Sequence, residues 1–334
     1  MAVRHEKLVV HLDQKDWIEL ARGYYGRDRE FEEIAQNVVE KSESGLAIFP
    51  LSITHFDETL KNLNSERRQR LAKYMILVSQ GWAILPAPMI IEPEIEDACR
   101  KYLGLPRYDL QKFAIKKGIS QLLGAKADLE IEAKDANSPL LKDLHLEDLK
   151  RELLEKVESP KMLLWFMERG FDKSELRRRQ EEAMATTEKL EQIRLTGQSQ
   201  IRDNDLRRRV AIVEYFLKVI NPKVITFLLS MNVDPTAFRV VLRSRKRTIR
   251  FFQSMPTSYC LVQLSHYRDM QRKRKIDPND LNDIMSLSIA IPYSDVVVTE
   301  TMWQTAIIQT KLNELRPTLI LRSVKELGPI LDQN

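Results

Sequence analysis

The chain has 334 residues, of which 43% are hydrophobic, and a formal net charge of +5. This length predicts two domains or one domain with a large insertion, and the many helix-favouring residues exclude a disordered chain. Polar residues interrupt both residues 1–12 and the longest apolar tract, residues 210–231, which excludes a signal peptide and a membrane span. We therefore expect a cytoplasmic protein that does not bind membranes.

The first third of the chain alternates between short apolar strands and amphipathic helices. The expected strands are residues 7–12, 46–51 and 82–86, and the expected helices are residues 31–43, 52–63 and 65–79. A further helix carries Trp17 and Leu20, with Asp16 as a candidate N-cap. Two more strands are expected near the C-terminus, at residues 295–299 and 318–322, with a helix at 302–315 between them. This alternation predicts an α/β protein with a mostly parallel sheet covered on both faces.

The middle of the chain, about residues 94–275, separates the third expected strand from the fourth and is therefore predicted to be an insertion. Helical periodicity recurs over residues 144–157, 162–169, 173–193, 205–219 and 235–255, so we expect this insertion to be entirely helical. Loop-forming residues at 196–203 predict a flexible connection. Cys99 and Cys260 have no partner at metal-ligand spacing, and we expect both to be buried free thiols.

Acidic residues follow the expected strands. Asp13 stands directly after the first strand, where ligands bind in open parallel sheets. Glu58 lies on the helix after the second strand, opposite that helix's apolar stripe, with Asp57 as the competing candidate. A solvated helix-surface carboxylate is the simpler interpretation of Glu58. His11, within the first strand, is expected to be a buried core histidine.

A second group of acids lies in the segment DPNDLNDIMSLSIAIPYSDVVVTE, residues 277–300. Asp277 and Asp280 match a capping box that begins a helix. Asp283 stands one turn beyond Asp280, and like charges at this spacing cost stability unless a cation lies between them. Asp295 opens the fourth strand, and Glu300 either begins the next helix or joins the acidic group. Oxygen ligands without cysteine or histidine favour Mg²⁺ or Mn²⁺, which can support phosphodiester hydrolysis.

These residues resemble the PIN domain family of nucleases (PilT N-terminus-like), in particular branches with a long insertion and a closing segment similar to NDLNDIMSLSIAIPYSDVVVTE. The resemblance covers residues 5–93 and 276–325, and the helical insertion, residues 94–275, resembles no family that we can name. The family implies a three-layer sandwich around a five-stranded parallel sheet, with strand order 3-2-1-4-5 and a cluster of acids at the carboxyl ends of the strands.

The resemblance also implies the site residues. By position, Asp13 and Glu58 match the first two acids, and Asp283 matches the third, with Asp280 as its alternative. The fourth acid is Asp295 or Glu300. The family pattern has Asp where this chain has Glu300, after Thr299, and this departure leaves the individual roles open. All six carboxylates are candidate ligands of Mg²⁺ or Mn²⁺.

Positive charge concentrates in residues 239–275, which hold 11 Lys or Arg residues and a single acid, Asp269. Such a segment favours binding to a nucleic-acid backbone. The candidate nucleic-acid-binding residues are Arg243, Arg247 and Arg250, at helical spacing, and the run Arg272, Lys273, Arg274 and Lys275. Phe251 and Phe252, within the same segment, are expected to be core residues.

Three functions compete on these grounds. The first is a metal-dependent endoribonuclease. The second is a catalytically silent module that binds nucleic acid or a partner protein. The third is a nuclease that cleaves DNA, as a toxin or defence effector would. RNA is favoured as the substrate, DNA stays open, and a regulatory protein partner and a homo-oligomer are further expectations.

Overall fold

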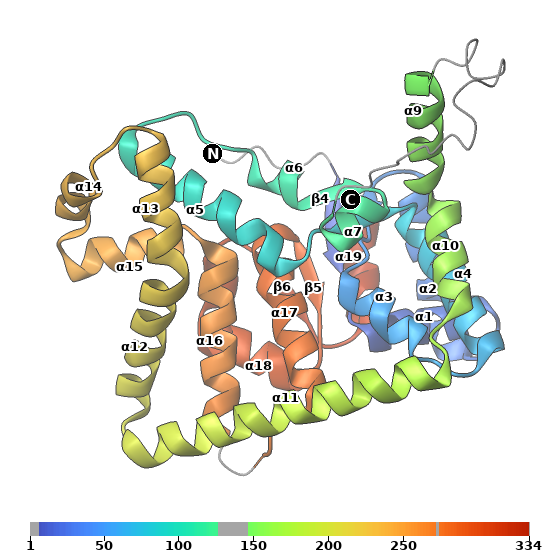
Figure 1. Cartoon of the computed structure of the whole chain (residues 1–334). Coiled ribbons are helices and arrows are strands. Elements are labelled where there is room, and N and C mark those ends of the chain that lie inside the picture. Colours follow the sequence, from blue (N-terminus) through green and yellow to red (C-terminus); the bar gives the residue numbers. More distant parts are fainter. Residues whose placement is uncertain (1–6, 126–145, 272–273, 334) are drawn as a thin grey trace.

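The structure, a computed structural model, describes residues 7–125, 146–271 and 274–333 (Figure 1). It is mostly helical, with a small parallel sheet near its centre, in agreement with the expected α/β class. None of the helices in these ranges is both long and apolar enough to cross a membrane.

The parallel sheet has four strands. In spatial order these are β2 (Ala47–Ile48), β1 (Leu8–His11), β5 (Val296–Val298) and β6 (Leu319–Leu321). Val10 lies opposite Val296, and Val296 lies opposite Leu319. Side chains alternate between the two faces, so Val10 joins one buried cluster and Val297 joins another. Each of these four strands lies within a segment that the sequence predicted.

The expected five-stranded sheet of order 3-2-1-4-5 is wrong. The third predicted strand, β3 (Trp82–Ile84), pairs antiparallel with β4 (Ile115–Lys117) in a separate two-stranded sheet. A single parallel bridge, between Leu51 and Ala83, links β3 to the end of the segment that contains β2. At this bridge the N–H of Leu51 donates a hydrogen bond to the Trp82 carbonyl, and the Leu51 carbonyl accepts one from the N–H of Ile84.

Helices from both ends of the chain cover the sheet. They are α1 (Gln14–Tyr24), η1 (Arg29–Phe31), α2 (Glu32–Glu43), α3 (Ile53–Leu60), α4 (Ser65–Ser79), α17 (Pro278–Tyr293), α18 (Thr301–Gln309), η3 (Leu312–Glu314), η4 (Val324–Leu327) and α19 (Gly328–Asp332). Trp17 and Tyr74 are buried on one face, and Trp303 is buried on the other. The N-cap of α1 is Asp13 rather than the expected Asp16, whose buried carboxylate accepts a hydrogen bond from the N–H of Val324.

The middle of the chain forms a helical frame beside the sheet. Its helices are α5 (Ala87–Leu103), α6 (Leu110–Ala114), α7 (Ile119–Leu123), α9 (Leu146–Val157), α10 (Pro160–Arg169), α11 (Lys173–Gln200), α12 (Asn204–Tyr215), the π-helical turn η2 (Phe216–Ile220), α13 (Asn221–Ser230), α14 (Pro235–Leu242), α15 (Arg245–Gln253) and α16 (Pro256–Met270). In Figure 1, α11 runs along one edge of the molecule, below α16 and α17.

One expectation for this middle region was wrong, one was partly right, and others are confirmed. The region is not entirely helical, because it contributes β4. The connection expected at residues 196–203 is confined to residues 201–203, because α11 continues to Gln200 and α12 begins at Asn204. Phe251 and Phe252 are buried in a core shared with Phe238, as expected. Cys99 and Cys260 are buried free thiols, also as expected.

Candidate active site

Two acidic residues stand at the carboxyl ends of neighbouring strands. Asp13 follows β1 and caps α1, where its carboxylate accepts a hydrogen bond of 3.3 Å from the N–H of Lys15. Glu300 follows β5 and occupies the N-cap position of α18, but its carboxylate makes no capping hydrogen bond. Because β1 and β5 are adjacent and parallel, the chain brings these two acids to the same edge of the sheet.

Two helices add one acid each to this edge. Glu58 on α3 and Asp283 on α17 line the same cavity as Asp13 and Glu300, with a volume of about 700 Å³. The indole N–H of Trp303 donates a 2.8 Å hydrogen bond to Asp283, which holds its side chain in place. We refer to Asp13, Glu58, Asp283 and Glu300 as the acidic cluster.

The acidic cluster concentrates negative charge in a half-buried place. Burial, followed by the charge of Asp13, raises the pKa of Glu58 to about 7. Burial also raises the pKa of Asp283 to about 7, with contributions from the other three carboxylates. The pKa of Asp13 is raised by burial and, less, by Glu300. Within residues 7–125, 146–271 and 274–333, no lysine or arginine forms an ion pair with the cluster, so protons or a bound cation would relieve the repulsion.

The carboxylates do not yet surround a common point. Among the described residues, no three His, Cys, Asp or Glu side chains are arranged so that they could hold a metal ion. Binding of an ion by the acidic cluster therefore requires its side chains to rotate toward one another. Asp13, Glu58 and Asp283 are only partly buried and Glu300 is exposed, so rotation does not require unfolding.

A small polar cavity lies beneath the acidic cluster. It has a volume of about 20 Å³, roughly the space that one water molecule needs, and Asp13, Glu58 and Asp283 contribute to its wall. The buried ring of His11 contacts the Ser286 hydroxyl at 3.1 Å, and burial lowers the pKa of His11 to about 4. Three buried polar atoms of the lining have no hydrogen-bond partner in the described structure: Nδ1 of His11, Oε1 of Gln14 and Oγ1 of Thr299.

Asp280, the alternative to Asp283, has a structural role. Only 1% of it is exposed, and its carboxylate accepts hydrogen bonds from Arg274 (2.7 Å) and from the N–H of Asp277 (2.9 Å). The predicted capping box is thus confirmed. Arg274 neutralises Asp280. The repulsion that the sequence predicted between Asp280 and Asp283 is therefore no argument for a bound cation. Asp283 is instead coupled to the other acids of the cluster.

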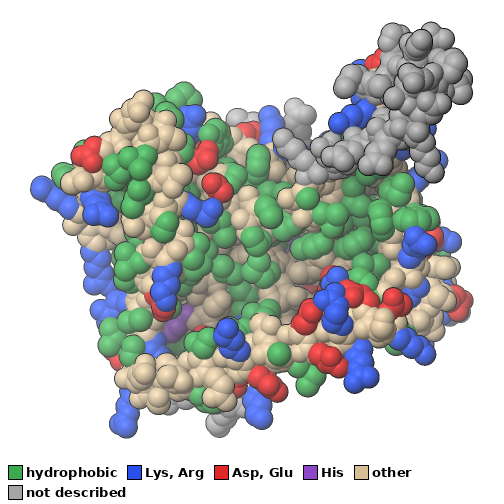
Figure 2. Space-filling view, in the orientation of Figure 1, with side chains coloured by type: hydrophobic (Ala, Val, Ile, Leu, Met, Phe, Trp, Pro, Cys, Tyr) green, Lys and Arg blue, Asp and Glu red, His purple; other side chains and the backbone are tan. Residues whose placement is uncertain are grey.

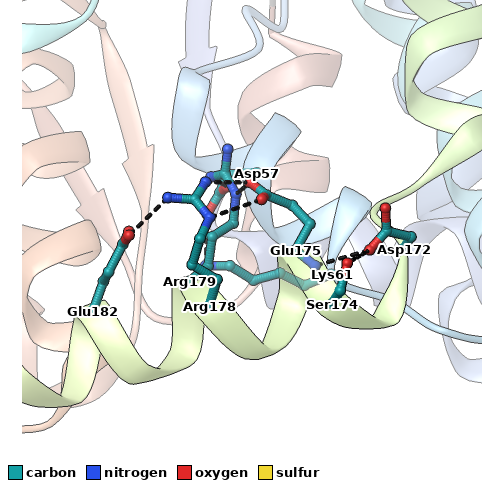
Figure 3. Close-up of polar contacts among 8 residues, drawn as sticks. All are labelled: Asp57, Lys61, Asp172, Ser174, Glu175, Arg178, Arg179 and Glu182. Atoms are coloured by element: carbon teal, nitrogen blue, oxygen red, sulfur yellow. Dashed lines mark hydrogen bonds and ion pairs between the residues drawn. The ribbon is translucent and has the colours of Figure 1, made fainter.

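Asp57, the alternative to Glu58, belongs to a network of ion pairs (Figure 3). It pairs with Lys61 on its own helix and, at 2.8 Å, with Arg179 on α11. Arg179 also pairs with Glu175 and lies over the ring of Phe171. This network ties α11 to α3. Asp57 and Arg179 line a different cavity from that of the acidic cluster, whereas Lys61 lines the cluster's cavity.

Asp295 does not join the acidic cluster, which corrects the expectation. It stands before β5, at the amino end of the strand, where its carboxylate accepts a 2.9 Å hydrogen bond from the N–H of Val9. The carboxyl ends of β1 and β5 lie at the opposite edge of the sheet. Asp295 therefore holds the start of β5 against β1.

The basic segment does not form one surface. Arg243 caps the C-terminal end of α14, whereas Arg247 and Arg250 lie on α15, so the three do not share one helix. All three are exposed on a corner of the molecule that is separated from α3 in Figure 1, and Figure 2 shows Lys and Arg side chains along that edge. Arg274 lines the cavity of the acidic cluster, Lys275 is exposed nearby, and Arg272 and Lys273 lie outside the described residues.

Sequence reasoning missed the residues that support the cluster. Trp303 holds Asp283, Asn282 hydrogen-bonds Glu58, and Gln14 and Ser286 line the small cavity beneath. Of these residues, only Asn282 and Gln14 could have been suspected from the sequence, because each adjoins a predicted acid.

Comparison of the chain with models of protein families, with curated proteins and with solved structures found no match.

Proposed function

We propose that this protein is a metal-dependent nuclease of PIN-like type that hydrolyses phosphodiester bonds in cytoplasmic RNA. One observation carries the proposal: four carboxylates from β1, α3, α17 and β5 converge at the carboxyl edge of the sheet, without an ion-pair partner among the described residues. A charge arrangement that destabilises the fold by itself is typical of a site that binds a cation.

The residues fit Mg²⁺ or Mn²⁺. The cluster offers oxygen atoms only, which these ions prefer over the nitrogen and sulfur ligands that zinc takes. Asp13, Glu58, Asp283 and Glu300 would hold the ion. A bound divalent cation would supply positive charge against the scissile phosphate. Trp303 and Asn282 each donate a hydrogen bond to one of the carboxylates, and the wall of the cavity also carries Lys15, Lys61 and Arg274, each paired with a carboxylate outside the cluster.

Cleavage of end-labelled strands tests the proposal. Purified wild type, Asp13→Asn and Asp57→Asn are incubated with single-stranded RNA and DNA in Mn²⁺, Mg²⁺ or EDTA, and the products are resolved on a gel. We expect metal-dependent cleavage of RNA by wild type and by Asp57→Asn, and none by Asp13→Asn. Cleavage of DNA alone would change the substrate and favour a toxin or defence effector.

A catalytically silent module that binds nucleic acid is the second candidate. Two observations favour it: no metal-ready group of ligands is formed among the described residues, and the exposed arginines of α14 and α15 lie on another corner of the molecule. Strand binding without cleavage under every metal condition would support this candidate and reject the nuclease.

A further inference from the structure

A second cavity adjoins the acidic cluster. It lies between α1 and α4 and has a volume of about 420 Å³. Ile18, Arg22, Asn62 and Leu71 line both this cavity and the one that holds the acidic cluster, so the two are continuous. Gln14, Ile18 and Arg22 stand four residues apart on α1, and this face of the helix forms a wall that leads from the acids into the second cavity.

Arginine dominates the second cavity. Its lining includes Arg22, Arg27, Arg67 and Arg70, against a single acid, Asp28. The Asp28 carboxylate already accepts a hydrogen bond from the N–H of Glu30. We refer to the surface formed by these four arginines as the arginine groove.

Half of this positive charge has no ion-pair partner among the described residues. Arg22 and Arg67 are exposed, and neither forms an ion pair with another residue in the part of the chain that the structure describes. Arg27 and Arg70 both pair with Glu66, whose side chain is 72% exposed. Exposed ion pairs of this kind are weak, and a phosphate can replace the carboxylate.

An aromatic ring stands at the far end of the arginine groove. Tyr25 lines the cavity, is 37% exposed and lies against Tyr24 with ring centroids 5.3 Å apart. Tyr24 in turn packs against the buried Tyr74. The ring of Tyr25 is therefore held at an open surface, where an unpaired base could stack on it.

We propose that the arginine groove binds the phosphate backbone of a single nucleic-acid strand, whose scissile bond then lies at the acidic cluster. The inference rests on the proposed function for the position of that bond. Because the groove is separated from α14 and α15, the strand reaches the acids along α1 and α4, without the exposed arginines of α14 and α15. Arginine forks match phosphate oxygens, and Tyr25 selects an unpaired strand over a duplex.

Binding and cleavage are measured separately to test this. Fluorescence anisotropy of a labelled oligouridylate in EDTA gives the affinity and its salt dependence, and the gel assay in Mn²⁺ gives the cleavage rate. We compare wild type with Arg22→Gln/Arg67→Gln, with Arg22→Lys/Arg67→Lys, and with the matched control Arg151→Gln/Arg177→Gln. Both control residues are exposed and lie outside the two cavities.

We expect the groove variant Arg22→Gln/Arg67→Gln to bind about tenfold more weakly or worse, and the control to bind as wild type does. The slope of log affinity against log salt should fall by roughly 1.4, since each phosphate contact of a single strand contributes about 0.7. The Lys variant should recover most of the affinity, which separates lost charge from misfolding. Tyr25→Leu should weaken binding about fivefold or more, whereas Tyr25→Phe should not.

Four outcomes are distinguishable. Weak binding and slow cleavage by the groove variant alone support the proposal. Weak binding by that variant when wild type cleaves nothing also supports the groove, and rejects only the nuclease. Wild-type binding and cleavage by the groove variant overturn the groove and leave the nuclease standing. Displacement of the strand by polyglutamate at equal charge concentration would also overturn it, since the groove would then be a general site for acidic peptides.

Discussion

Asp57 and Glu58 are neighbours on α3, yet they belong to two different kinds of charged region. Asp57 faces α11 and is neutralised by Lys61 and Arg179 (Figure 3). Glu58 faces the sheet edge, where its carboxylate lies near Asp13 and has no ion-pair partner among the described residues. Burial and the charge of Asp13 raise its pKa to about 7. Asp57 has two ion-pair partners, whereas Glu58 has none among the described residues and lies in a half-buried site beside Asp13.

The comparison teaches how a structural carboxylate differs from a candidate functional one. A paired carboxylate at the surface contributes little stability and costs little. Several unpaired carboxylates in a half-buried cavity destabilise the folded state. Their accumulation in one cavity therefore favours a role in binding, beyond the hydrogen bonds that Asp13 and Asp283 accept.

The largest effect is expected from Asp283→Asn. We expect cleavage to fall by about 100- to 1,000-fold, because the variant loses a ligand of the proposed ion. The same variant should unfold at higher temperature without metal at about pH 8, because the substitution removes a charge that the fold disfavours. Gel assays of cleavage and thermal unfolding in EDTA measure the two effects, and Asp57→Asn serves as the control. Loss of both activity and stability would contradict the comparison.

Glu94 is a harder case, because it is fully buried without an ion pair in the described structure and yet lies outside the acidic cluster. Its carboxylate accepts hydrogen bonds from the Tyr293 hydroxyl (2.8 Å) and the N–H of Thr257 (3.1 Å). Burial raises the pKa of Glu94 to about 7 from an ordinary value of 4.5. A buried acid without an ion pair can thus be held by hydrogen bonds, here with the charge of Arg316 as a smaller contribution.

The raised pKa of Glu94 makes the free energy of unfolding depend on pH, with a sign that can be stated. A folded-state pKa above the unfolded one means that stability is present at low pH and is lost as the pH rises through about 7. Between about pH 4 and pH 8, wild type should therefore lose roughly 2–3 kcal/mol more unfolding free energy than Glu94→Gln. Urea unfolding of both proteins at the two pH values measures the difference. An equal change in unfolding free energy for wild type and Glu94→Gln would show that burial does not oppose the ionisation of Glu94.

Much of the fold was predictable. The four strands of the parallel sheet lie in short apolar runs, and runs of this length are typical of buried strands. The pairing of the third predicted strand was not predictable, because its antiparallel partner, β4, lies in a segment whose pattern predicted only helices. Helical periodicity likewise could not show that the predicted helix 235–255 breaks at Ser244, where a serine caps a new helix.

The site was predictable where strand polarity decides it. Asp13 and Glu300 follow parallel strands and therefore share an edge, whereas Asp295 precedes its strand and should have been assigned to the opposite edge by the same rule. Arg274 as the partner of Asp280 could not be predicted, since it depends on how the loop before α17 folds back. The arginine groove was also hidden, because its residues are scattered between Arg22 and Arg70 and only the packing of α1 on α4 unites them.

Metal affinity should depend on pH in the acidic cluster. A metal ligand must be deprotonated, and the pKa values of Glu58 and Asp283 are about 7. We expect the affinity for Mn²⁺ to rise about tenfold or more between about pH 6 and pH 8, with release of protons on binding. Isothermal titration calorimetry in buffers of different ionisation enthalpy measures both. Affinity that is independent of pH would mean that the ion binds elsewhere.

The smallest effect is expected for the paired side of the comparison. The Arg179 and Asp57 side chains are 39% and 24% exposed, so their ion pair should contribute only about 0.2–1 kcal/mol. A double-mutant cycle with Asp57→Asn and Arg179→Met measures this coupling in urea unfolding, and the cycle of Asp57→Asn with Arg177→Met is its control, because Arg177 pairs with Glu181 instead. Cleavage should be unchanged throughout, since neither Asp57 nor Arg179 lines the cavity of the acidic cluster. A coupling above about 2 kcal/mol would show that the pair behaves as a buried one. The ion pair between α11 and α3 would then be strong enough to hold Glu58 in position. Asp57 would support the candidate site, and the two carboxylates of α3 could no longer be separated into a structural one and a functional one.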